Sequence, residues 1–114
     1  MNEIKLYHGD CLEIMKDVAD NSVDLILCDL PYGTMKNANI EGWVNKNERL
    51  VWDNVIDSEK LFANYERILR RNGIAILFSQ EPYTSHLRKF NKTNFDFLYP
   101  LIWKKRPFCQ RFNV

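Results

Sequence analysis

The sequence predicts an α/β protein with a mainly parallel sheet. Residues 23–28 and 74–78 form two short, almost unbroken apolar runs, as expected for strands that are covered on both faces of a parallel sheet. Residues 57–71 lie between the runs and repeat apolar side chains at helical spacing. A polar turn follows each run, and ligands of open α/β sheets bind just beyond the carboxyl ends of the strands. We therefore expect a ligand site at these turns.

Weaker patterns add two more strands. Apolar residues predict a short strand at 4–7, and alternating apolar residues predict another at 95–103. Pro100 restricts the latter to a sheet edge or a bulge, because proline cannot donate to the hydrogen-bond ladder. The expected architecture has about three to four mainly parallel strands with flanking helices.

Helices are expected at three places. Residues 11–18 have apolar positions at helical spacing, with Asp10 either as a plain helix cap, as a ligand contact, or as both. Residues 84–90 predict a short helix. The long helix at 57–71 ends at the glycine stop signal Asn72-Gly73. Its last turns carry three cations that are expected to form a solvated face: Arg67, Arg70 and Arg71.

Size and composition are ordinary for a globular chain. The 114 residues have room for one domain, spanning 1–114. The net charge of +1 gives no strongly basic face, although a local basic cluster suffices for nucleic acid. Three cysteines and two isolated histidines lack metal-ligand spacing, so reduced thiols and no metal are expected. Without a signal segment or a membrane-spanning apolar run, a cytoplasmic protein with no membrane association is expected.

The turn after the first apolar run suits a planar base that carries an exocyclic amino group. Asp29 offers a carboxylate acceptor, and Tyr32 offers an aromatic face on which a base can stack. Pro31 removes a backbone donor, so that nearby carbonyls stay free to accept, and Gly33 permits close approach of the backbone. The alternative is that Asp29 only caps the next element and Tyr32 packs in the core.

The turn at 29–32 reads Asp-Leu-Pro-Tyr and resembles the Asp-Pro-Pro-Tyr catalytic motif of the amino-group DNA methyltransferases. The resemblance continues in chain order on both sides. A Gly-Asp-Cys segment at 9–11 and an Ile-Trp-Lys segment at 102–104 are similar to segments of that family. The resemblance therefore covers nearly the whole chain. It favours the adenine-N6 branch, because many cytosine-N4 enzymes open the motif with Ser instead of Asp.

This resemblance implies a partial Rossmann-like, S-adenosylmethionine-dependent methyltransferase fold that acts on DNA. The target adenine is flipped out of the duplex, because its amino group is otherwise paired. Asp29 and the Leu30 carbonyl then accept the amino hydrogens, Tyr32 stacks on the base, and Pro31 completes the catalytic motif. The residues expected beside the cofactor are Asp10, Cys11 and Asp29.

Two further segments are expected to contact the substrate. Residues 34–51 lack periodicity and predict a long loop. This loop either closes over the target base through Trp43 or leaves Trp43 to cover an edge of the core. The C-terminal tail mixes cations with phenylalanines, which suits a flipped or single-stranded nucleotide, or else a frayed terminus. Its candidate substrate contacts are Lys104, Lys105 and Arg106.

A glycine-rich cofactor loop is not visible, because none of the four glycines stands at Gly-x-Gly spacing. We therefore expect the N-terminal half of a catalytic domain, truncated before that loop, with an exposed apolar sheet edge and face. Such a chain is either inactive alone or completes its sheet with a second polypeptide or a second copy. The alternative function is a catalytically inactive binding or inhibitory protein that acts through a protein partner.

Overall fold

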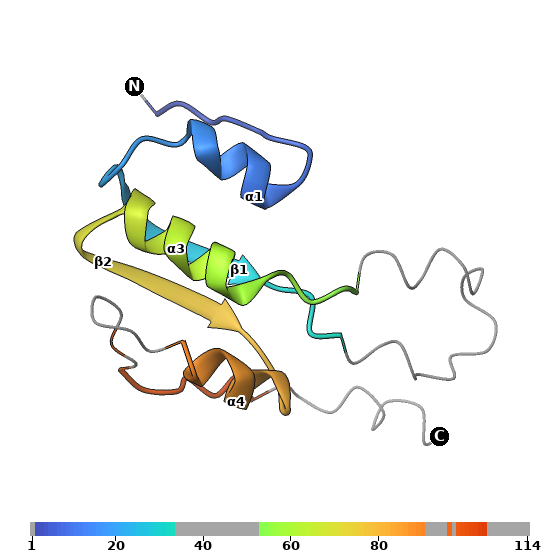
Figure 1. Cartoon of the computed structure of the whole chain (residues 1–114). Coiled ribbons are helices and arrows are strands. Elements are labelled where there is room, and N and C mark those ends of the chain that lie inside the picture. Colours follow the sequence, from blue (N-terminus) through green and yellow to red (C-terminus); the bar gives the residue numbers. More distant parts are fainter. Residues whose placement is uncertain (1, 34–52, 91–95, 97, 105–114) are drawn as a thin grey trace, which may run out of the picture.

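The computed structural model describes residues 2–33, 53–90, 96 and 98–104 (Figure 1). In chain order its elements are α1 (Cys11–Ile14), the 3-10 helix η1 (Met15–Asp17), β1 (Val23–Asp29), α3 (Ser58–Ile68), β2 (Leu69–Phe78) and α4 (Tyr83–Arg88). β1 and β2 pair in parallel, with α3 between them in the chain. The predicted α/β class with parallel strands is confirmed.

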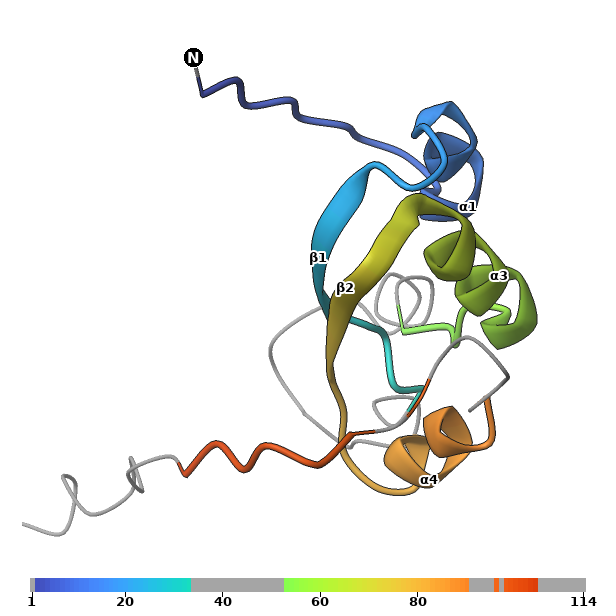
Figure 2. The same ribbon diagram turned by 90° about the vertical axis from the view of Figure 1, so that its left-hand side faces the viewer.

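The helices α1, α3 and α4 all lie on the same side of the two strands (Figure 2). On this side Ile26 and Cys28 of β1 and Leu77 of β2 pack against the buried core. The strand register places Cys28 opposite Leu77, so the inward side chains of the two strands share one face. The residues at the centre of the core are Leu30, Leu61, Tyr65 and Tyr83.

The opposite face of the sheet is apolar and exposed. Leu25 stands opposite Ile74 in the register, and these two residues are 52% and 50% exposed. Leu27 lies on the same face, two residues along β1, and is 64% exposed. The expectation that β1 is covered on both faces is therefore wrong for the part of the chain that the structure describes. The exposed apolar face expected of a partial sheet is observed.

α3 forms where the sequence predicts it and ends three residues earlier. The Asp57 carboxylate accepts a hydrogen bond from the Lys60 amide at 3.2 Å and caps the first turn. The apolar stripe of Leu61, Tyr65 and Ile68 is buried against the sheet. Leu69 then adopts an extended conformation and pairs with Val23, so that β2 follows the helix without a loop.

The Asn72-Gly73 pair lies inside β2 and does not end the helix. The register slips between Val23 and Leu25, so the extra residues of β2 bulge out of the ladder. Asn72 has a left-handed φ of 68° within this bulge. A Cβ on Gly73 would stand 2.9 Å from the Arg70 carbonyl oxygen. The glycine therefore serves a close backbone approach rather than a helix stop.

Two predicted strands are not formed. Residues 4–7 pair with no described strand, and Ile4 and Leu6 are 87% and 92% exposed. Residue 96 and residues 98–103 also lack strand structure, whereas 95 and 97 lie outside the described residues. The sheet described here therefore has two strands instead of three to four. An alternating pattern marks a segment that fits a pleated surface, but a strand also needs a neighbouring edge to pair with.

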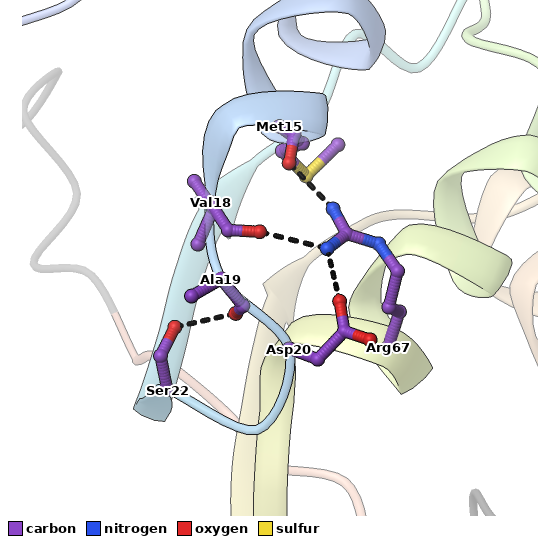
Figure 3. A network of polar contacts seen from close by, with 6 residues as sticks. All are labelled: Met15, Val18, Ala19, Asp20, Ser22 and Arg67. Carbon is purple, nitrogen blue, oxygen red and sulfur yellow. Dashed lines mark hydrogen bonds and ion pairs between the residues drawn. The ribbon is translucent and has the colours of Figure 1, made fainter.

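Arg67 fastens the end of α3 to the segment that leads into β1 (Figure 3). One of its terminal nitrogens donates to the Met15 carbonyl at 2.6 Å. The other donates to the Val18 carbonyl and to the Asp20 carboxylate, both at 2.7 Å. The Asn21 amide donates in turn to the Arg67 carbonyl at 2.9 Å. A planar guanidinium with several donors suits this convergence of acceptors.

The expected solvated arginine face is thus wrong for Arg67. The prediction holds for Arg70 and Arg71, which are exposed. Arg70 makes an ion pair with Asp24 at 2.8 Å on the protein surface, where such pairs contribute little stability. In the described part of the chain, no helix is long and apolar enough to cross a bilayer.

Replacing Arg67 by alanine is expected to lower the free energy of unfolding by about 2–3 kcal/mol, because two carbonyls lose a charged donor. Arg67→Lys keeps the charge but loses the fork, so most of this loss should remain. Denaturant unfolding followed by circular dichroism measures both. The control is Arg71→Ala, at an exposed site, with an expected change within about 0.5 kcal/mol. Equal losses at the two positions would contradict a fastening role for Arg67.

Candidate active site

The turn at 30–33 leaves the sheet at the carboxyl end of β1. Asp29, the last residue of the strand, stands opposite Phe78, the last residue of β2. The next side chain, Leu30, is buried in the core cluster, whereas Asp29 is exposed. The buried leucine anchors the turn and leaves the carboxylate at the surface. The predicted site therefore lies where two parallel strands end together.

Asp29 and Tyr32 meet across the turn. The Tyr32 hydroxyl donates a hydrogen bond to Asp29 Oδ1 at 2.8 Å. Burial, and then the hydrogen bond and charge of Asp29, raise the pKa of Tyr32 to about 12. The phenol is therefore protonated and remains a donor at neutral pH. The structure brings together the acid and the aromatic ring that the sequence predicts at one site.

Gly33 closes the turn against the segment that precedes α3. Its amide donates to Asp53 Oδ1 at 3.0 Å, and Asp53 is fully buried. Gly33 has a φ of +73°, and an added Cβ would stand 2.9 Å from Val55 Cγ2, so a side chain is excluded on both grounds. Sequence reasoning missed this role of Asp53. In the sequence, Asp53 is a single acid just after the predicted loop at 34–51, which gives little indication that it binds the Gly33 amide.

Tyr83 packs against Tyr32 of the turn, and sequence reasoning also missed this role. It is 3% exposed, and its ring centroid lies 5.7 Å from that of Tyr32 at an angle of 35°. It also stacks on His86, with centroids 5.8 Å apart, and His86 Nε2 lies 2.9 Å from Ser58 Oγ. The Tyr83 hydroxyl is buried and has no hydrogen-bond partner among the described residues. The sequence signal was an aromatic residue in the polar turn after β2.

The start of α1 packs against the same core as the end of β1. Asp10 caps this helix, accepting a hydrogen bond from the Leu12 amide at 2.8 Å. Burial raises the pKa of the Cys11 thiol, and Asp10 and Cys28 raise it further. Both thiols are free. Of the residues predicted near a cofactor, Cys11 thus packs against the same core as Cys28, the residue that precedes Asp29.

The predicted substrate contacts are only partly described. Lys104 is exposed and follows Trp103, whose ring centroid lies 5.8 Å from that of Phe78 at the end of β2. The remaining predicted contacts, and the whole loop at 34–51, lie outside the described residues: Trp43, Lys105 and Arg106. Within the described ranges, no group of three or more His, Cys, Asp or Glu residues is arranged to hold a metal ion.

Raising the pH above 10 is expected to destabilise the protein through Tyr32. Its folded pKa of about 12 exceeds the ordinary value of 10.0, so the native chain holds a proton that the unfolded chain releases. The stabilisation is complete below pH 10 and is lost as the pH rises to about 12. Unfolding free energies of the wild type and Tyr32→Phe, compared along this pH series, isolate the effect from the other tyrosines. If the unfolding free energies of the wild type and Tyr32→Phe fall in parallel between pH 10 and 12, Tyr32 does not contribute this pH dependence.

The chain was compared with known proteins. Over 94 residues it is 32% identical to the Type II methyltransferase M.BamHI of Bacillus amyloliquefaciens, a match that covers 80% of this chain and 21% of that protein. In a second match, which is 114 positions long, the chain is 29% identical to the Type II methyltransferase M2.MboI of Moraxella bovis. This match covers 88% of this chain and 40% of that protein. No family model and no solved structure matches.

The chain therefore spans about a fifth of one of these curated relatives and two fifths of the other. Both relatives are methyltransferases of the same type, and most of this chain takes part in each match. These similarities confirm the resemblance that the sequence predicts: this chain is similar, over most of its length, to part of a Type II methyltransferase.

Proposed function

We propose that this chain is part of a methyltransferase that methylates the exocyclic N6 amino group of adenine in DNA, with S-adenosylmethionine as the methyl donor. The observation that carries the proposal is the contact between the Asp29 carboxylate and Tyr32 in the turn after β1. The similarity to two Type II methyltransferases supports methyl transfer as the class of reaction. The aspartate that opens the motif favours adenine over cytosine.

The turn offers an amino group two acceptors and one stacking surface. The Asp29 carboxylate is exposed and already accepts one O–H donor, so an N–H donor suits the same oxygen. The buried Leu30 side chain fixes the backbone whose carbonyl is the second acceptor, and Pro31 contributes no competing N–H. Acceptance of the amino hydrogens directs the nitrogen lone pair toward the methyl donor. Positioning then supplies much of the rate enhancement.

The start of α1 fits part of the proposed cofactor. One oxygen of the exposed Asp10 carboxylate accepts from the Leu12 amide, and a carboxylate has acceptor capacity left for a ribose hydroxyl. Cys11 packs against the same core as Cys28, which directly precedes Asp29 in the chain. We propose that Asp10 and Cys11 hold the adenosine part. When bound, S-adenosylmethionine supplies an electrophilic methyl group.

The direct test is to incubate the full chain with radiolabelled S-adenosylmethionine and DNA, and to identify the methylated base after hydrolysis. N6-methyladenine in the wild type and none in Asp29→Ala is the expected result. N4-methylcytosine would overturn the choice of base. A folded chain that binds S-adenosylmethionine but transfers no methyl group would overturn catalysis by this chain alone.

A second candidate function is the binding of a protein partner without catalysis. It is favoured by the bare sheet face, where Leu25, Leu27 and Ile74 are about half exposed or more. Apolar faces of this kind commonly mark interaction sites. The two functions separate by mutation, because partner binding should survive Asp29→Ala and should be lost in Leu27→Asp. Sedimentation of both variants over a concentration series tests whether a second copy of the chain is the partner.

A further inference from the structure

The Tyr32 hydroxyl occupies the acceptor that the proposed function assigns to the base. It donates to Asp29 Oδ1 at 2.8 Å, an ordinary distance for an O–H···O hydrogen bond. An adenine amino group is also a hydrogen-bond donor carried on a flat aromatic system. The phenol is therefore a chemical stand-in for the amino group, and an amino group that binds Asp29 Oδ1 competes with it.

The Tyr83 hydroxyl is the candidate second acceptor for the Tyr32 hydroxyl. The Tyr83 ring lies against the Tyr32 ring, with centroids 5.7 Å apart, and the charge of Tyr83 contributes to the raised pKa of Tyr32. The Tyr83 hydroxyl is buried and unpartnered within the described ranges, and burying such a group without a partner is costly. A new hydrogen bond to this hydroxyl is therefore expected to be stabilising.

Tyr83 is also held in place, as a fixed acceptor needs to be. Its residue is 3% exposed, and its ring stacks on His86 at an angle of 20°. His86 is fixed in turn by Ser58 Oγ, 2.9 Å from its Nε2, at the start of α3. A line of contacts thus runs from α3 through α4 to the catalytic turn. Tyr32, at its end, is the more accessible of the two tyrosines.

Building on the function proposed above, we propose that Tyr32 has two positions. Its hydroxyl bonds to Asp29 when no base is present, and it moves to the Tyr83 hydroxyl when the amino group of a base takes the carboxylate. Tyr83 is then a positioning residue that sets the orientation of Tyr32 over the base. The exchange also confers specificity, because a base without an amino group has no donor to replace the phenol at Asp29.

The exchange can be tested without any ligand, by removing the first acceptor. In the wild type, Tyr83→Phe deletes an unpartnered hydroxyl and should leave the folding equilibrium constant unchanged or raised. In the Asp29→Ala background the Tyr32 hydroxyl is expected on Tyr83, so Tyr83→Phe should lower that constant about fivefold. Adding Tyr32→Phe to that background should remove the loss. The same effect of Tyr83→Phe with and without Asp29 overturns the exchange.

The ligand test uses a short oligothymidine with one central adenine, and the same strand with purine, which lacks the amino group, in place of adenine. Unpaired strands need no base flipping. Fluorescence anisotropy should show about tenfold tighter binding of the adenine strand by Tyr32→Phe, which keeps the ring and deletes the competing hydroxyl. The purine strand should show no gain.

Tyr83→Phe should weaken adenine binding about fivefold in the wild type and leave it unchanged in the Tyr32→Phe background. Weaker adenine binding by Tyr32→Phe, or an equal effect of Tyr83→Phe in both backgrounds, overturns the proposal. If no variant prefers adenine to purine, the proposed function fails, and with it the role of the exchange in base selection. The ligand-free cycle still decides separately whether the hydroxyl moves.

Discussion

Replacing Asp29 by alanine is expected to lower methyl transfer to DNA about a hundredfold to a thousandfold. The substitution removes the carboxylate to which the proposed function assigns an amino hydrogen, and losing one well-placed hydrogen-bonding group at a reacting centre has an effect of this order. The side chain is exposed at the end of β1, so the fold should survive. Initial rates with radiolabelled S-adenosylmethionine, at saturating DNA, measure the change.

Two variants give this prediction its controls. Asp29→Asn keeps an acceptor oxygen but loses the charge, so its rate should fall between those of the wild type and Asp29→Ala. Asp24→Ala removes another exposed carboxylate from the same strand, one that pairs with the surface residue Arg70 at 2.8 Å, and should change the rate less than twofold. A loss in Asp24→Ala equal to that in Asp29→Ala would show that general charge, and not the position of Asp29, governs the rate.

The sequence predicts those parts of the molecule that depend on neighbours in the chain. An unbroken apolar run identifies β1, and a capped apolar stripe identifies α3. The site follows from the same local information, since Asp29 and Tyr32 are three residues apart and one turn suffices to join them. Asp10 likewise caps the helix that immediately follows it.

The contacts that sequence reasoning missed join residues far apart in the chain. Arg67 reaches carbonyls 49 and 52 positions away, and a run of arginines near a helix end gives no sign of such acceptors. Asp53 binds the Gly33 amide across 20 positions. The unpaired segments 4–7 and 98–103 fail for the opposite reason, because their patterns fit a strand but no described strand lies beside them. Strand formation requires a neighbouring strand edge as well as a suitable sequence pattern.

Replacing Leu61 by alanine is expected to lower the free energy of unfolding by about 3 kcal/mol. Leu61 is 1% exposed and lies on α3 at the centre of the core, where it faces the sheet. Truncation leaves a cavity among large neighbours that are themselves fixed, including Leu30 and Tyr65. Denaturant unfolding at low protein concentration measures the loss, which is a large fraction of the stability of a small domain.

The matched variant is Leu27→Ala, on the bare face of the sheet. Leu27 is 64% exposed, so the same deletion there should cost less than about 1 kcal/mol, most of it from strand preference. The contrast tests whether the hydrophobic core lies on one side of the sheet only. A cost at Leu27 that approaches the cost at Leu61, and grows with protein concentration, would show that the bare face is covered in solution by a second copy of the chain. In that case the apolar face contributes to stability through association, and the two-stranded sheet is one half of a larger core.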